Sequence, residues 1–148
     1  MNHKLKVSCC KDKLQNIRTY VQEQLKGYTL SEVTVNQLVL AVDEVCSNLM
    51  IHSHNCNPHH SIELVITIDA GSSITFEISD EGQGFNFHAY QEPCLEEIIR
   101  ARKKGGIGLL LVKRIMDRIE YDFDEKTQRN IYRLHKITNA TRRTSVSK

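Results

Sequence analysis

The spacing of apolar residues changes from a helical period to a strand period in the first half of this 148-residue chain. Between residues 31 and 52 apolar residues recur every three or four positions, which predicts an amphipathic helix. Between residues 62 and 78 they alternate with other residues, which predicts two strands joined by a turn at 70–72. A chain that carries both patterns must pack helices against a sheet, so we expect an α+β fold.

The same two patterns predict the remaining elements of the domain. A strand around Leu5 precedes a helix with apolar positions at 14, 17, 21 and 25, and Gly27 stands where the residue after a helix belongs. After an irregular stretch, which is compatible with a short helix at 94–102, the pattern predicts one helix and two strands. These elements span 106–117, 118–123 and 130–137. We expect a two-layer α/β sandwich: a mixed, mostly antiparallel sheet with helices packed on one face.

Composition narrows the class of protein. The domain is expected over residues 1–137, and the polar stretch 138–148 is expected to be a disordered tail. With 20 basic against 18 acidic residues the net charge is only +2, so we expect no direct nucleic-acid binding. No apolar run approaches the roughly 20 residues that span a bilayer, and no signal-peptide core is visible at the N-terminus. We therefore expect a cytoplasmic protein with no membrane contact. The chain has five cysteines, an odd number without paired spacing, so we also expect reduced thiols.

One short segment is dense in residues that bind metals in other proteins. A zinc site needs ligands that converge from rigid elements, whereas Asn55, Asn57 and Pro58 predict a loop here. We therefore favour an ordinary loop over a metal site. The His and Cys residues of this segment are His52, His54, Cys56, His59 and His60.

The predicted helix over 31–52 carries a polar pair, Glu44 and Asn48, on one face. By helical-wheel arithmetic this face is separate from the main apolar stripe. A carboxylate and an amide at that position can hold a hydrated divalent cation or accept a proton from a hydroxyl. An ordinary surface pair four residues apart is the alternative.

A second motif, Asp80-Glu81-Gly82-Gln83-Gly84, follows directly after a predicted strand. Gly82 and Gly84 allow the backbone to turn sharply and to approach a flat ligand. The Asp80 carboxylate at the strand end can accept a hydrogen bond from an exocyclic amine such as that of adenine. An ordinary turn would contain the same residue types.

A third motif, Gly105-Gly106-Ile107-Gly108, opens a helix and is preceded by Lys103 and Lys104. Free N–H groups at a helix N-terminus form an anion site, and the lysines add positive charge. Close helix packing at Gly108 and a solvated lysine pair are the alternative. Neither a Walker-type loop nor a dinucleotide-binding G-x-G-x-x-G motif is present.

The order of the three motifs resembles the N, G1 and G2 boxes of the superfamily of gyrase, histidine-kinase, heat-shock-chaperone and mismatch-repair ATPases. Within that superfamily the chain is most similar to the stand-alone anti-sigma factor serine/threonine kinases. The likeness covers about Leu5 to Ile137 and implies a histidine-kinase-like ATPase (Bergerat) fold. It is carried by Leu40-Ala41-Val42-Asp43-Glu44 with Asn48 and His52, and by the loop 55–58.

The resemblance implies a role for each matching residue. Glu44 is expected to act as the general base, and Asn48 to bind the Mg²⁺ that bridges the phosphates of ATP. Asp80 is expected to read the adenine amino group. The remaining nucleotide-binding residues implied by the resemblance are Gly82, Gly84, Lys104, Gly105, Gly106 and Gly108.

The resemblance also implies a function. Members of the family phosphorylate a serine or threonine of a small STAS-type antagonist protein, bind a sigma factor in competition with it, and are in many cases homodimers. The Lys103–Lys104 pair departs from relatives that carry an acidic-basic pair there. A self-contained histidine kinase is not expected, because no helix pair with a phosphoacceptor histidine precedes the motifs. A non-catalytic ATP-binding module that sequesters a partner is the alternative.

Overall fold

A computed structural model of the chain describes residues 2–54, 56–81 and 106–143. For residues 2, 3, 52, 53 and 106–109 we describe the backbone alone. The helix expected at 94–102 lies outside the described residues.

The described strands form one five-stranded sheet with the order β1-β2-β3-β5-β4, and all four of its pairings are antiparallel. The hairpin expected from the alternation over 62–78 is confirmed, and Gly71 in its turn has a positive φ of 78°. The strands are β1 (Asn2–Ser8), β2 (Ser61–Asp69), β3 (Ser73–Glu81), β4 (Arg118–Asp124) and β5 (Arg129–Ile137).

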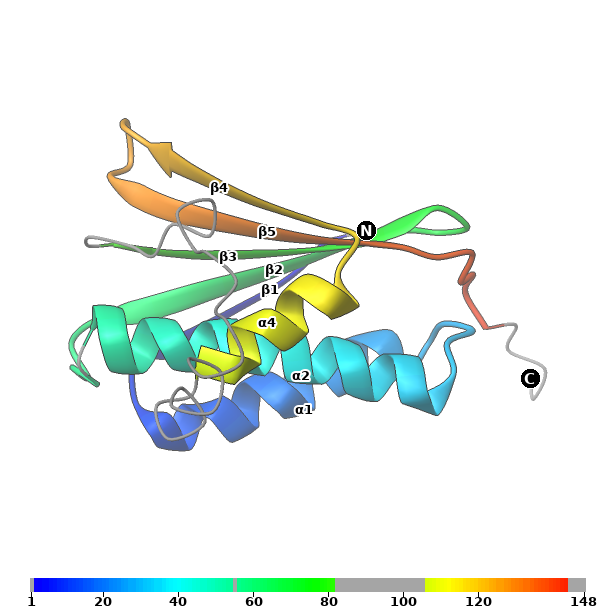
Figure 1. The fold of residues 1–148 in the computed structure, drawn as a ribbon, viewed down its shortest axis with the longest axis horizontal. Coiled ribbons are helices and arrows are strands. Elements are labelled where there is room, and N and C mark those ends of the chain that lie inside the picture. The colour runs from blue at the N-terminus through cyan, green and yellow to red at the C-terminus, as the bar shows by residue number, and fades with distance from the viewer. Residues whose placement is uncertain (1, 55, 82–105, 144–148) are drawn as a thin grey trace.

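The helices lie together on one face of the sheet, as Figure 1 shows, so the expected two-layer arrangement is confirmed. Ser31 is the N-cap of the central helix, and its hydroxyl accepts a hydrogen bond from the Thr34 backbone N–H at 3.1 Å. The helices are α1 (Leu14–Leu25), α2 (Glu32–Asn48) and α4 (Gly106–Ile115); a 3-10 turn (Lys11–Lys13) precedes α1, and a π-helical turn, η2 (Leu49–Ser53), follows α2.

The hydrophobic core lies between the two layers because each strand places alternate side chains toward the helices. In both β2 and β3 every second side chain is buried, and the predicted stripe of α2 is buried against them. The inner face of β3 carries Ile74, Phe76, Ile78 and finally Asp80. The row of inward-facing side chains on β3 is therefore apolar except for its last member, which is a carboxylate.

The C-terminal end of α4 is attached to β5 by polar contacts. The Lys136 ammonium donates to the Ile115 carbonyl at 3.0 Å, and the Ile137 N–H donates to Asp117 Oδ2 at 2.6 Å. A cation at the last carbonyls of a helix also interacts favourably with the helix dipole. These contacts fix the direction of the helix that begins at Gly106.

Residues 138–143, the first part of the segment expected to be a disordered tail, lie against the domain. The Gly71 N–H donates to the Ala140 carbonyl and the Thr29 N–H to the Thr141 carbonyl, each at 2.8 Å. Ala140 is 1% exposed and belongs to the hydrophobic core. This part of the C-terminal segment therefore contributes to the packing of the domain.

We predict that Ala140→Asp lowers the free energy of unfolding by about 2 kcal/mol or more, because it places an unpaired charge in a buried position. Asn139→Asp adds the same charge at an exposed neighbouring position and serves as the control. Urea denaturation of both variants measures the difference. Equal stabilities would show that residues 138–143 do not pack in this way.

Candidate functional site

Glu44 and Asn48 lie one turn apart on α2, and both side chains are half-buried. The Asn48 side-chain amide Nδ2 donates a hydrogen bond to the Glu44 backbone carbonyl at 2.7 Å. This bond fixes the Asn48 side chain on its own helix and leaves its oxygen Oδ1 as the atom that can bind a cation.

The surroundings of Glu44 favour proton acceptance. Burial raises the pKa of the Glu44 carboxyl above its ordinary value, the neighbouring Asp43 raises it further, and Arg18 on α1 lowers it. Arg18 Nε donates to Asp43 Oδ1 at 2.8 Å, so the charge of Asp43 is largely balanced. A carboxylate with a raised pKa binds a proton more readily and is the better general base.

Asp80 is fully buried at the end of β3, on the face of the sheet that the helices cover. Burial is the main cause that raises the pKa of its carboxyl group. Within the part of the chain that the structure describes, Asp80 Oδ1 is the one buried side-chain oxygen or nitrogen without a hydrogen-bond partner. A buried acceptor without a donor requires a physical reason, and a ligand with an N–H group provides one.

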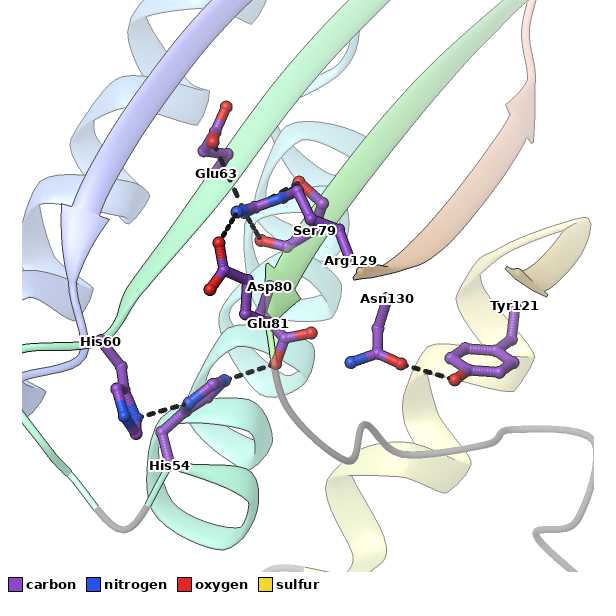
Figure 2. Close-up of polar contacts among 9 residues, drawn as sticks. All are labelled: His54, His60, Glu63, Ser79, Asp80, Glu81, Tyr121, Arg129 and Asn130. Carbon is purple, nitrogen blue, oxygen red and sulfur yellow. Dashed lines mark hydrogen bonds and ion pairs between the residues drawn. The ribbon is translucent and has the colours of Figure 1, made fainter. Parts of the chain in front are cut away.

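His54 and Asn130 lie on opposite sides of Asp80, as Figure 2 shows, with a contact drawn from His54 to Asp80 and one from Asn130 to Tyr121. On one side His54 Nε2 lies 2.5 Å from Asp80 Oδ2. On the other side hydrogen bonding from the Asn130 side chain helps to lower the pKa of Asp80, and the Tyr121 hydroxyl donates to Asn130 Oδ1 at 2.6 Å. The carboxylate is thus oriented by a loop residue and by strand β5.

A second histidine, His60, links His54 to the surface of the molecule. His54 Nδ1 lies 2.9 Å from His60 Nδ1, and the two rings meet edge to face. Next to them is a cavity of about 180 Å³, lined by His54, His59, His60, Ser61 and Glu81. The site at Asp80 is therefore linked to an exposed residue through one buried ring.

The carboxylate of Asp80 lies close to the helix that carries Glu44 and Asn48. Burial is the main cause that raises the pKa of the Cys46 thiol, and the charge of Asp80 raises it further; Cys46 lies between Glu44 and Asn48 in the sequence of α2. Helix α4, which begins at Gly106 and includes Gly108, packs against α2. Of the other expected nucleotide-binding residues, Gly82, Gly84, Lys104 and Gly105 lie outside the described residues.

Three residues of this arrangement are missing from the sequence-based site. Asn130 is the first inward-facing residue of β5, and the next two inward-facing residues are Tyr132 and Leu134. An amide at the start of this buried row is the signal that could have identified it. Tyr121 pairs with Tyr132 on the neighbouring strand, so it lies diagonally across from Asn130, and only the strand register brings the two side chains together. For His54 the sequence indicates only a possible metal ligand. Among the described residues no group of three or more His, Cys, Asp or Glu side chains could hold a metal ion.

Comparison with known proteins identifies the class of protein. Residues 8–136 match the model of the histidine kinase-like ATPase domain. Because this match covers most of the chain, the chain belongs to the histidine kinase-like ATPase domain family, and the expected superfamily is confirmed.

Two individual proteins resemble the chain. One is the serine-protein kinase RsbW of Halalkalibacterium halodurans, which is 28% identical over 102 residues, or 66% of this chain and 60% of that protein. The other is in the crystal structure of the SiaB–SiaC complex from Pseudomonas aeruginosa, which has a TM-score of 0.62 and 11% identity over 92% of this chain and 89% of that one. The first supports the resemblance to anti-sigma factor kinases, and the second shows the fold alone. No helix in the described ranges is both long and apolar enough to cross a membrane.

We predict that Asp80→Asn changes the pH dependence of stability. Because burial raises the pKa of Asp80 in the folded state, ionisation of this carboxyl lowers the stability of the wild type as the pH rises through that pKa. The stability of Asp80→Asn relative to the wild type should therefore increase between pH 4 and pH 7, as measured by denaturant unfolding across that range. Asp69→Asn, at an exposed position, is the control, and a constant difference for Asp80→Asn would contradict the electrostatic argument.

Proposed function

We propose that this protein is an ATP-dependent protein serine/threonine kinase that acts as an anti-sigma regulatory factor. The observation that carries the proposal is the buried, unpartnered Oδ1 of Asp80 beside the helix that presents Glu44 and Asn48. Membership of the ATPase family and the likeness to a serine-protein kinase support it.

In this proposal Asp80 recognises adenine. Its Oδ1 is an acceptor in a site with no competing water-exposed surface, and the 6-amino group of adenine is a donor. Gly82 and Gly84, which follow Asp80 in the sequence, let the backbone lie close to the flat base. Pairing with the amine satisfies the acceptor that is unpaired in the free protein.

The phosphates are assigned to α2 and to the start of α4. Asn48 Oδ1 is a hard oxygen ligand of the kind that Mg²⁺ prefers. The bound Mg²⁺ would neutralise part of the phosphate charge. Gly106 and Gly108 lie in the first turn of α4, where free N–H groups and the positive end of the helix dipole favour anions. Lys104 and Gly105 directly precede this turn in the sequence, and we assign them to the same phosphates.

Glu44 is the proposed general base. Its carboxylate accepts the proton of a serine or threonine hydroxyl, the hydroxyl oxygen forms a bond to the γ-phosphorus, and ADP leaves with the electron pair of the broken bond. The raised pKa of Glu44 suits this role, because the group must bind a proton during transfer and release it afterwards.

The partners follow from the kinase family that the chain resembles. We assign the acceptor hydroxyl to a small STAS-type anti-sigma-factor antagonist, with a sigma factor as the competing partner and a homodimer as the assembly, in the cytoplasm. The matched region spans 60% of the serine-protein kinase relative.

Calorimetric titration with ATP and ADP, each with and without Mg²⁺, tests nucleotide binding. We predict that Mg²⁺ strengthens ATP binding to the wild type and that Asn48→Ala removes this enhancement. Asn36→Ala, an exposed position on the same helix, is the matched control. If no nucleotide binds under any of these conditions, the proposed function is wrong.

A second prediction concerns phosphoryl transfer. Glu44→Gln should keep ATP binding but lower the rate of transfer to a STAS-type acceptor by roughly 10² or more, the scale of general-base catalysis. Radiolabelled phosphate incorporation measures the rate, and Glu32→Gln, an exposed change on the same helix, should leave it unchanged. Full activity of Glu44→Gln would remove Glu44 from the mechanism.

A further inference from the structure

The two oxygens of the Asp80 carboxylate have different surroundings. Oδ2 is engaged by the His54 ring at 2.5 Å, whereas Oδ1 has no partner among the described residues. His54 is itself 4% exposed, so neither ring nitrogen is freely hydrated. The histidine therefore occupies one oxygen of the carboxylate, and the other oxygen has no partner.

The charge of Asp80 determines the direction of its hydrogen bond with His54. An ionised carboxylate can only accept, so His54 Nε2 donates to Asp80 Oδ2. His54 Nδ1 lies 2.9 Å from His60 Nδ1, and one of these two ring nitrogens donates a hydrogen bond to the other. In this chain of three, Asp80 Oδ2 and both ring nitrogens of His54 have partners, whereas Asp80 Oδ1 has none.

We propose that His54 is a positioning residue that sets base specificity: by holding Oδ2 it presents Oδ1 as an acceptor only, so the site takes a 6-aminopurine nucleotide and rejects a 6-oxopurine one. A 6-oxo group is an acceptor, and two acceptors facing each other in a buried site repel. This inference rests on the proposed nucleotide site.

The electrostatics of Asp80 support this role. Burial favours the protonated carboxyl group, and the hydrogen bond from His54 is the largest of the influences that lower the Asp80 pKa again. A protonated carboxyl group could donate to a 6-oxo oxygen, so selectivity depends on ionisation. The other ionisable groups that interact with Asp80 or with its histidine are Cys9, Cys46, His60, Tyr121 and Arg129.

Loop anchoring is the competing explanation for His54. Its backbone already makes two loop contacts, since the His54 N–H donates to the Leu49 carbonyl and its carbonyl accepts from the Asn57 N–H. A purely structural side chain would affect the binding of all nucleotides equally. It would not make the ratio between two nucleotides depend on pH.

The test compares ATP with ITP, which carries a 6-oxo group in place of the 6-amino group. We measure both dissociation constants from pH 6 to pH 9 for the wild type, His54→Ala, His54→Gln and His59→Ala. His59 lines the same cavity but is exposed and makes no described contact with Asp80. The glutamine amide can donate from a position similar to that of His Nε2, so His54→Gln is the conservative rescue.

We expect the wild type and His59→Ala to prefer ATP by about 10- to 100-fold across the range. His54→Ala should lose more of this preference as the pH falls, because loss of the His54 hydrogen bond favours the protonated Asp80 carboxyl group, and His54→Gln should retain it. An ATP preference in His54→Ala that equals that of the wild type at pH 6 overturns the inference and leaves the proposed function intact. A wild type that binds neither nucleotide overturns both.

Discussion

The burial of the Asp80 carboxylate is the constraint on which the rest of the site depends. Removing a charge from water is costly unless hydrogen bonds replace the lost hydration. The His54 ring at Oδ2 and the Asn130 side chain supply hydrogen bonds to the carboxylate, but Oδ1 has no partner. The protein thus keeps an unsatisfied acceptor in its interior, and such a group requires a physical reason.

Both layers of the fold contribute to this arrangement. The sheet places Asp80 beside Asn130, because β3 and β5 pair antiparallel with these two residues in register. The helical layer places His54, because the chain leaves α2 through a π-helical turn that ends with a bond from the His54 N–H to the Leu49 carbonyl. Short π-helical segments within helices occur frequently at functional sites.

The opposite face of the sheet has a different chemistry. There the cross-strand neighbours are ion pairs, among them Lys4 with Glu63 at 2.9 Å and Arg133 with Glu77 at 3.1 Å. Such partly exposed pairs contribute little stability each. The separation of an ion-paired outer face from an apolar inner face explains why the buried polar residues of the inner face stand out as functional candidates.

How much of this protein could be predicted from sequence depends on the range of the interactions. The helices, the hairpin and the Glu44–Asn48 pair were predictable because they depend on contacts within one or two turns or on simple alternation. Asp80 was recognised only as one residue of a motif. Its relation to His54, 26 residues away, and to Asn130 and Tyr121 depends on strand register and on how the loop after α2 packs. Local patterns carry no information about such pairings, so tertiary structure alone decided which donors surround the carboxylate and which of its oxygens has no partner.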